Sequence, residues 1–204
     1  LLCAYSKGIF PWYEVGQPIL WWSPDPRLVL FPDELKISRS LRKVLRKEQF
    51  EIRFDTVFQE VIKSCADVRT NQGEGTWIIP EMQQAYTELH QEGFAHSVES
   101  WLDGKLVGGL YGISIGQCFF GESMFSTMND SSKVALVALT DFSQRVGIKL
   151  IDCQMTTPHL LSLGAREIKR EVFIKMLKKY LDTYSIKGLW NNGPVSMKVN
   201  LLQN

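Results

Sequence analysis

The chain has 204 residues, of which 45% are hydrophobic and 22% charged, so it can bury a sizeable core as one large domain or two small ones. Its net charge of +1 excludes a global basic field, and any contact with nucleic acid must therefore come from a local cluster of Lys and Arg. No apolar run approaches the roughly 20 residues of a membrane span, and four widely spaced cysteines without a C-x-x-C pair favour a reducing compartment, the cytoplasm.

The stretch from residue 5 to residue 32 is rich in aromatic side chains and punctuated by prolines, which rule out a long helix. Residues 19–22 and 28–31 are short strand candidates on either side of a rigid turn. Aromatic residues such as Trp12 suit the packing of a core, and they also suit stacking on a nucleobase. Composition alone favours the core, because large aromatic side chains are mostly buried.

A short basic helix is expected from Ser38 or Ser40 to about Lys47. Residues 36–47 contain six basic side chains and no acidic one. Helical spacing gathers most of them into a ridge of positive charge, formed by Arg39, Arg42, Lys43, Arg46 and Lys47. Such a ridge suits the phosphates of a nucleic acid, and a solvated helix face has the same pattern, so both interpretations stay open.

The remaining elements predict an α+β fold. A strand at 50–54 and helices at 56–65 and from Pro80 to about Gly93 precede a change to period two, with strands at 94–101, 105–115 and 117–123. A helix to about Val146, a strand at 149–154 and a helix at 170–182 follow. Three antiparallel strands, a crossover helix and a parallel strand are the core order of the GNAT acyltransferase fold.

The expected architecture has two parts. A small N-terminal α/β domain covers residues 1–63, and a GNAT-like domain covers residues 64–204, with a mixed, mainly antiparallel sheet flanked by helices.

Glu122 is an acidic residue among aromatic ones, at the end of a predicted core strand in the run FFGESMF. A carboxylate in such a place must find a partner or raise its pKa. It either shapes the turn through contacts to backbone amides or a cation, or it contacts an amine of a substrate. Residue type alone favours the first interpretation.

Asp152 and Gln154 lie two residues apart in a strand, so alternation predicts that they share one face, while Ile151 and Cys153 share the other. An acid and an amide on one face can orient an amine and accept its proton, and a free α-amine with a pKa of about 8 needs only a weak base. A loop cap is the alternative for Asp152. No nucleophile stands in a triad spacing and no zinc spacing is present, so neither a covalent intermediate nor a metal is expected.

The junction before the crossover helix, STMNDSSK, contains no glycine. Acetyltransferases of this fold use a glycine-rich turn there to hold the pyrophosphate of coenzyme A. Coenzyme A is therefore disfavoured and no cofactor is expected. Two other functions stay open for a chain of this predicted fold. One is an acyl-CoA-dependent N-acyltransferase, and the other is a non-enzymatic tRNA-binding module.

Eight ordered segments carry a resemblance to a known family: GIFPW at 8–12, ILWWSPDPR at 19–27, TWI at 76–78, AHSVE at 95–99, LVGGLYG at 106–112, FGESMFS at 120–126, IDCQ at 151–154 and HLLSLGA at 159–165. From Ala4 to about Phe173 the chain resembles the bacterial leucyl/phenylalanyl-tRNA:protein transferases. The resemblance implies transfer of Leu, Phe or, less well, Met from aminoacyl-tRNA to proteins that begin with Arg or Lys. It also implies a cytoplasmic monomer that directs its products to N-degron proteolysis.

The resemblance further implies roles for individual residues. Asp152 and Gln154 are expected at the catalytic centre, with Glu122 beside the reacting amine. A hydrophobic pocket for the amino-acid side chain is expected from Leu110, Phe119, Leu136, Leu139 and Ile151. The residues expected to hold the terminal adenosine of the tRNA are Trp12 and Trp77, with Tyr5 and Tyr86 nearby. The basic ridge is a candidate contact for the acceptor stem.

Overall fold

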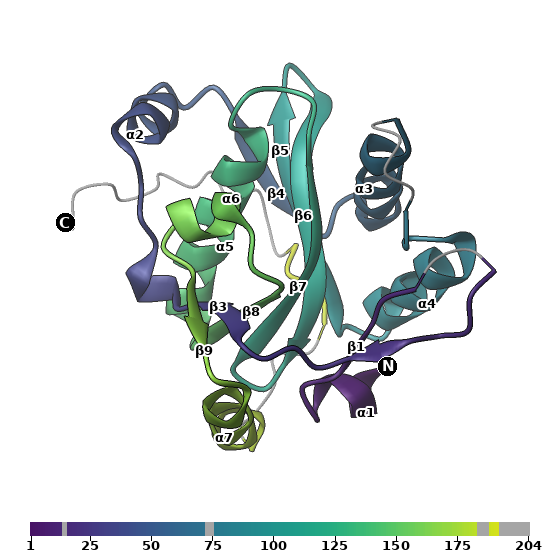
Figure 1. The fold of residues 1–204 in the computed structure, drawn as a ribbon. Coiled ribbons are helices and arrows are strands. Elements are labelled where there is room, and N and C mark those ends of the chain that lie inside the picture. Colours follow the sequence, from purple (N-terminus) through teal and green to yellow (C-terminus); the bar gives the residue numbers. More distant parts are fainter. Residues whose placement is uncertain (14–15, 72–75, 183–187, 192–204) are drawn as a thin grey trace.

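The computed structural model describes residues 1–13, 16–71, 76–182 and 188–191, and it is built around a seven-stranded sheet (Figure 1). In spatial order the strands are β4 (Glu51–Phe54), β5 (Ala95–Leu102), β6 (Lys105–Ile115), β7 (Cys118–Ser126), β8 (Leu150–Gln154), β3 (Arg27–Leu30) and β9 (Arg166–Ile168). Within this sheet β7 and β8 are parallel and the other neighbours are antiparallel. The predicted mixed, mainly antiparallel sheet is confirmed.

The centre of the sheet follows the predicted order of elements. Strands β5, β6 and β7 form an antiparallel meander with tight turns. Helix α5 (Ser131–Val146) then crosses over and ends at Gly147, whose φ of 87° is the left-handed conformation that glycine adopts at helix ends. The chain returns as β8, parallel to β7. The crossover therefore places the first residues of β7 and β8 side by side.

Helices cover both faces of the sheet (Figure 1). One hydrophobic cluster joins the sheet to α1 (Leu2–Tyr5), α3 (Phe58–Asn71), α4 (Pro80–Gln91) and α7 (Arg170–Leu181). A second cluster joins it to α2 (Arg39–Arg46) and α5. The remaining elements are short: β1 (Phe10–Pro11) and β2 (Trp21–Trp22) form a two-stranded sheet, and η1 (Pro32–Glu34) and α6 (Pro158–Ser162) lie in connections.

Local sequence signals explain where two of the helices begin. The hydroxyl of Ser38 accepts a hydrogen bond from the N–H of Leu41 and so caps α2. Pro80 occupies the first turn of α4, where its missing N–H costs nothing. The sequence did not predict α1, α6 or β9, because elements of three to five residues carry too little periodicity.

The sheet joins segments from both sides of the predicted domain boundary at residue 63. Strands β3 and β4 precede this residue, and they pair with β8 and β5, which follow it. The boundary itself stays a prediction. In the described ranges, the helices are too short or too polar to cross a membrane.

Candidate active site

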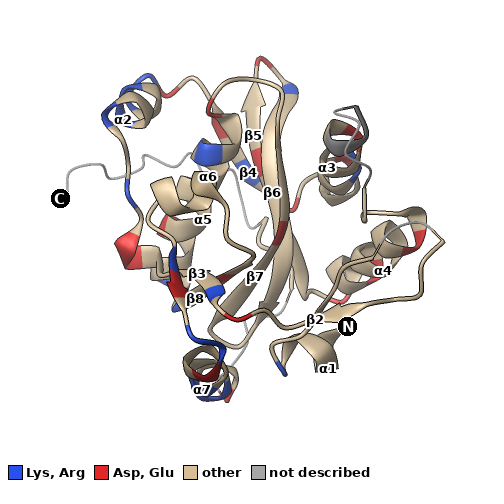
Figure 2. Cartoon of the chain, in the orientation of Figure 1, with Lys and Arg blue, Asp and Glu red and all other residues tan. Residues whose placement is uncertain are grey.

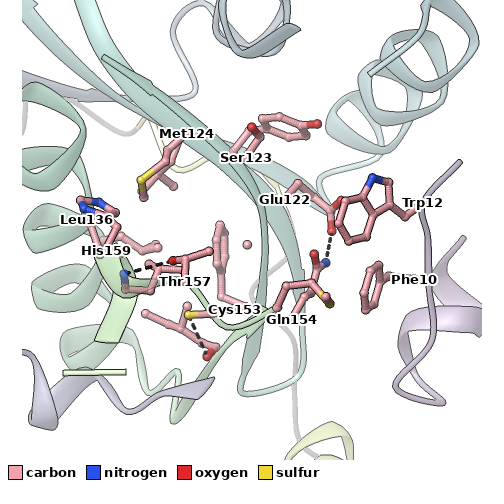
Figure 3. Close-up of a pocket in the computed structure, with 18 of the residues that line it drawn as sticks. Phe10, Trp12, Glu122, Ser123, Met124, Leu136, Cys153, Gln154, Thr157 and His159 are labelled. Atoms are coloured by element: carbon pink, nitrogen blue, oxygen red, sulfur yellow. Dashed lines mark hydrogen bonds between the residues drawn. The ribbon is translucent and has the colours of Figure 1, made fainter. Parts of the chain in front are cut away.

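A pocket of about 400 Å³ opens where the parallel strands β7 and β8 separate (Figure 3). Their pairing covers three residue pairs and ends at Phe120 and Asp152. Beyond that point both strands contribute pocket walls, residues 121–124 from β7 and residues 153–155 from β8 and its end. The gap lets the pocket reach the side chains of both faces of the sheet.

One arm of the pocket is apolar. It is lined by the five side chains that the resemblance predicted, Leu110, Phe119, Leu136, Leu139 and Ile151, each at most 3% exposed. Met124, Leu136, Thr157 and His159 lie together on this side in Figure 3. Burial, followed by the charge of Lys133, lowers the pKa of His159. The imidazole that lines the pocket is therefore uncharged at physiological pH.

The other arm is aromatic and polar. Phe10, Trp12 and Trp77 line it together with Glu122 and Gln154. The side chain of Trp12 is 37% exposed at the rim, whereas that of Trp77 is buried. In Figure 3 Trp12, Phe10, Glu122 and Gln154 face one another on the side of β7 and β8 opposite to Leu136.

A β-bulge aims Glu122 into this second arm. Tyr111 of β6 pairs with Ser123 and Gly112 pairs with Gly121, so Glu122 is the extra residue of β7. A bulge of this kind turns a side chain out of the regular alternation, and bulges are frequent beside active sites. Glu122 therefore lines the pocket, although its side chain is only 8% exposed.

Three hydrogen bonds hold the carboxylate of Glu122. Its Oε1 accepts from the hydroxyl of Tyr5 at 2.7 Å and from Nε2 of Gln154 at 2.9 Å, and its Oε2 accepts from the hydroxyl of Tyr86 at 2.7 Å. Burial raises the pKa of Glu122 to about 7, although these three hydrogen bonds act in the opposite direction. The group can therefore exchange a proton near neutral pH.

Tyr5 and Tyr86 lie beneath Glu122 and not beside the pocket. Both side chains are 0% exposed and their hydroxyl oxygens are 2.6 Å apart. Burial, followed by the charge of Glu122, raises the pKa of each tyrosine well above its ordinary value, so both remain protonated donors. In the structure both tyrosines support the carboxylate of Glu122, and their predicted place near the terminal adenosine stays a prediction.

Asp152 lies behind the pocket wall. Its carboxylate accepts two hydrogen bonds from Arg27, Nε to Oδ1 at 2.8 Å and Nη2 to Oδ2 at 2.6 Å, and a third from the N–H of Gln154 at 3.0 Å. Asp152 is 0% exposed and Arg27 1% exposed. The carboxylate thus has three hydrogen-bond partners within the protein and does not line the pocket.

The contacts of Asp152 and Gln154 lie on one side of the sheet, as alternation predicted: Asp152 binds Arg27, which contacts Phe10, and Gln154 binds Glu122 on the side of Phe10, whereas Ile151 and Cys153 pack on the other side. The pairing of β8 is nevertheless irregular. Leu28 pairs with Gln154 and Val29 with Asp152, so Cys153 is an extra residue and β8 has a bulge of its own. Ile151, Cys153 and Gln154 line the pocket, and Asp152 does not. Two bulges, one in each of the separating strands, therefore place Glu122 and Gln154 within hydrogen-bond distance.

Comparison with known proteins gives the chain a family. The family model described as leucyl/phenylalanyl-tRNA protein transferase matches residues 29–178, and the model of the N-terminal domain of the same family matches residues 1–25. A relative with this name from Aromatoleum aromaticum is 61% identical over 94% of this chain and 80% of its own length. Another, from Desulfatibacillum aliphaticivorans, is 54% identical over 94% of this chain and 82% of its own length.

The chain belongs to the leucyl/phenylalanyl-tRNA protein transferase family. The predicted family and the predicted enzyme class, an aminoacyltransferase, are confirmed. Among solved structures, the chain is similar to an aminoglycoside acetyltransferase from an uncultured soil metagenomic sample in complex with sisomicin. That similarity has 14% identity and a TM-score of 0.44, and it covers 56% of this chain and 84% of that chain.

In this member of the leucyl/phenylalanyl-tRNA protein transferase family, the basic ridge lies on α2, outside the pocket lining. Figure 2 shows the positive charge of α2 on the surface of the molecule. Arg39, Lys43, Arg46 and Lys47 are exposed and Arg42 is half-buried. Their predicted contact with tRNA stays a prediction. Over the ranges that the structure covers, His, Cys, Asp and Glu do not gather in groups of three that could hold a metal ion.

Sequence reasoning missed Arg27, although this residue ends the segment ILWWSPDPR on which the resemblance to the transferase family partly rests. Its partner, Asp152, is 125 positions away in the chain, so neither periodicity nor motif spacing could join the two. Phe10, which lines the pocket and contacts Arg27, was missed for the same reason.

Proposed function

We propose that the chain transfers leucine or phenylalanine, and less well methionine, from aminoacyl-tRNA to the N-terminal α-amine of proteins that begin with Arg or Lys. The observation that carries the proposal is the joining of an apolar arm to the hydrogen-bonded pair Glu122 and Gln154 at the gap between β7 and β8. The family to which the chain belongs, and the names of its relatives, support the choice of donor.

The two arms of the pocket suit the two ends of an aminoacyl adenosine. The amino-acid side chain enters the apolar arm, and the adenine lies against Trp12 and Trp77 in the other. An apolar arm binds Leu and Phe favourably. It discriminates weakly between similar apolar side chains, because each methylene contributes only about 1 kcal/mol to the binding free energy. This explains a donor range that includes Met.

The ester then lies at the gap, next to Gln154 and Glu122. Gln154, steered by Asp152, aims the acceptor amine at the carbonyl carbon, and the carboxylate of Glu122 accepts a hydrogen bond from that amine. A carbon–nitrogen bond forms, the carbon–oxygen bond to the ribose breaks, and the proton lost by the amine ends on the ribose oxygen. The carboxylate also favours acceptors with a cationic first residue.

The biological setting follows from the proposed reaction. A protein that receives N-terminal Leu or Phe enters the bacterial N-degron route to proteolysis, and the enzyme works in the cytoplasm as a monomer. The basic ridge of α2 contacts the acceptor stem of the tRNA, since its cations have few acidic neighbours.

A transfer assay tests the proposed function. Radiolabelled Leu-tRNA or Phe-tRNA is mixed with peptides that differ only in their first residue, Arg, Lys or Ala. Label is expected on the Arg and Lys peptides alone, with release of free tRNA. A protein that binds tRNA without regard to its aminoacylation and labels no peptide would be a binding module and not an enzyme.

Variants of the two predicted catalytic residues locate the reaction. Gln154→Ala and Asp152→Asn are expected to lower turnover by about 100-fold, because small displacements of a positioning group cost this much, while the Kd for Phe-tRNA changes by less than about threefold. Equal losses of turnover and affinity in both variants would contradict the assignment.

A further inference from the structure

We propose that Arg27 is a positioning residue for the transfer reaction, and that it acts by fixing Asp152 and, through Asp152, the backbone of Gln154. The inference rests on the proposed function, because it takes Gln154 to be the residue that faces the reacting ester. The contacts of four neighbouring residues carry the argument.

Gln154 has an unusual backbone conformation. Its φ of 62° lies in the left-handed region, which residues other than Gly, Asn and Asp rarely adopt. Such a conformation persists only where the surroundings hold it. The N–H of Gln154 donates to Oδ1 of Asp152 at 3.0 Å, and its Nε2 donates to Glu122 at 2.9 Å. The contact with Asp152 holds the backbone of Gln154 in this conformation. The conformation in turn directs the side chain of Gln154 toward Glu122.

Asp152 can hold Gln154 only while its own carboxylate is fixed. The guanidinium of Arg27 binds both carboxylate oxygens, at 2.8 Å and 2.6 Å, in the planar two-point geometry that Arg forms with carboxylates. This contact sets the plane of the carboxylate and therefore the direction in which Oδ1 accepts from Gln154. Lys could supply the charge but not the two-point contact.

Arg27 is itself held between two aromatic rings. Its guanidinium carbon lies 4.8 Å from the ring centre of Phe10 and 4.7 Å from that of Phe173. Phe10 also lines the pocket, so the same ring contacts Arg27 and borders the proposed adenosine arm. A buried ion pair of this kind is weak evidence for stability, because apolar replacement of both partners is often neutral. The effect of the ion pair between Arg27 and Asp152 that matters here is to fix the orientation of the carboxylate.

The first test is Arg27→Lys. Single-turnover transfer from Phe-tRNA to a peptide that begins with Arg is expected to slow by about tenfold or more, while the Kd for Phe-tRNA changes by less than about threefold. Rates are expressed per site that binds an aminoacyl adenosine with an amide in place of the ester, so unfolded protein does not contribute. A rate equal to that of the wild type, or equal losses of rate and affinity, would overturn the proposal.

A matched control is Arg166→Lys. Arg166 makes a similar two-point contact with Glu34 and lies over the ring of Phe31, but it is exposed on β9 and does not line the pocket. Its transfer rate is expected to stay within about twofold of the wild type, since exposed ion pairs contribute little.

The second test asks whether Arg27 acts through Asp152. Arg27→Met combined with Asp152→Asn removes both buried charges, so no unpaired charge remains to unfold the protein. Two residues on one path give losses that do not multiply, and the double variant is expected to transfer at the rate of Asp152→Asn alone, within about twofold. A double variant about tenfold slower than Asp152→Asn would show that Arg27 acts by another route. A wild-type protein without transfer activity would refute the proposed function instead.

Discussion

Glu122 has a pKa that lies close to neutral pH in the folded protein, because burial outweighs its three hydrogen bonds. An exposed carboxyl in an unfolded chain keeps the ordinary value of 4.5. The folded state therefore binds the proton more tightly than the unfolded state. This contribution to stability is complete below about pH 4.5 and is lost as the pH rises through about 7.

The substitution Glu122→Gln removes this pH dependence. Between pH 4.5 and pH 8, the free energy of unfolding of the wild type is expected to fall relative to that of the variant, by up to about 3 kcal/mol at about 1.4 kcal/mol per pKa unit. Urea unfolding at a series of pH values measures the difference. Parallel profiles for the two proteins would mean that Glu122 has an ordinary pKa.

The same substitution has a second expected effect, on the transfer rate. Glu122 accepts a hydrogen bond from the acceptor amine only as a carboxylate, so the wild-type rate is expected to rise with pH through about 7. In the variant only the titration of the amine itself, near pH 8, remains. Loss of this lower inflection in the variant distinguishes a group that acts at the reaction from one that only supports the fold.

At the scale of elements, the bulge in β7 depends on a pair of glycines that face each other, Gly112 of β6 and Gly121 of β7. A Cβ atom added to Gly112 would lie 2.2 Å from the carbonyl oxygen of Phe120 and 2.6 Å from the ring of Phe119. A Cβ added to Gly121 has the carbonyl oxygen of Asp152 at 3.6 Å, an ordinary contact. The two glycines are paired across the strands, but only Gly121 has room for a larger side chain.

Gly112→Ala is expected to destabilise the protein by about 2 kcal/mol or more, because the clash is with backbone and with a buried ring. Gly121→Ala is expected to cost less than about 1 kcal/mol. Chemical unfolding of both variants measures the costs. Equal costs would mean that β6 and β7 separate easily at the bulge, contrary to the packing of Phe119 against Gly112.

Most elements could be predicted from the sequence, because their signals are local. The meander, the crossover helix and β8 follow from periodicity and from caps such as Ser38 and Gly147. The five side chains of the apolar arm were predicted as one pocket by resemblance, and the structure brings them together. Their role in substrate binding stays a prediction.

The two bulges could not be predicted, because each depends on the register between strands. Within β7 nothing in the sequence around Glu122 marks an extra residue, and only the partners Tyr111 and Gly112 reveal it. The same holds for Cys153, whose extra position appears against Leu28 and Val29. Periodicity within one strand therefore cannot show the irregular pairing at the candidate active site, because that irregularity appears only against the neighbouring strand.

At the scale of the whole molecule, the near-zero net charge hides a local excess of positive charge on α2. The proposed contact with tRNA would be electrostatic, so it should weaken with salt. Lys43→Glu combined with Arg46→Glu is expected to raise the Kd for Phe-tRNA by about tenfold and to reduce the slope of log K against log salt by about two.

Lys63→Glu combined with Lys105→Glu is the matched control. Both lysines are exposed, on α3 and at the turn that begins β6, and the pair changes the net charge by the same amount. If the two double variants weaken tRNA binding equally, net charge and not α2 is responsible, and the ridge is a solvated helix face.

The position of β3 has a consequence for synthesis of the protein. This strand holds Arg27 and lies between β8 and β9, whose residues are made more than a hundred positions later. Until the ribosome has produced residues 150–168, both edges of β3 lack their partners, and Asp152 does not yet exist to meet Arg27. A nascent chain thus acquires the ion pair between Arg27 and Asp152, behind the candidate active site, only after more than a hundred further residues have been added after β3.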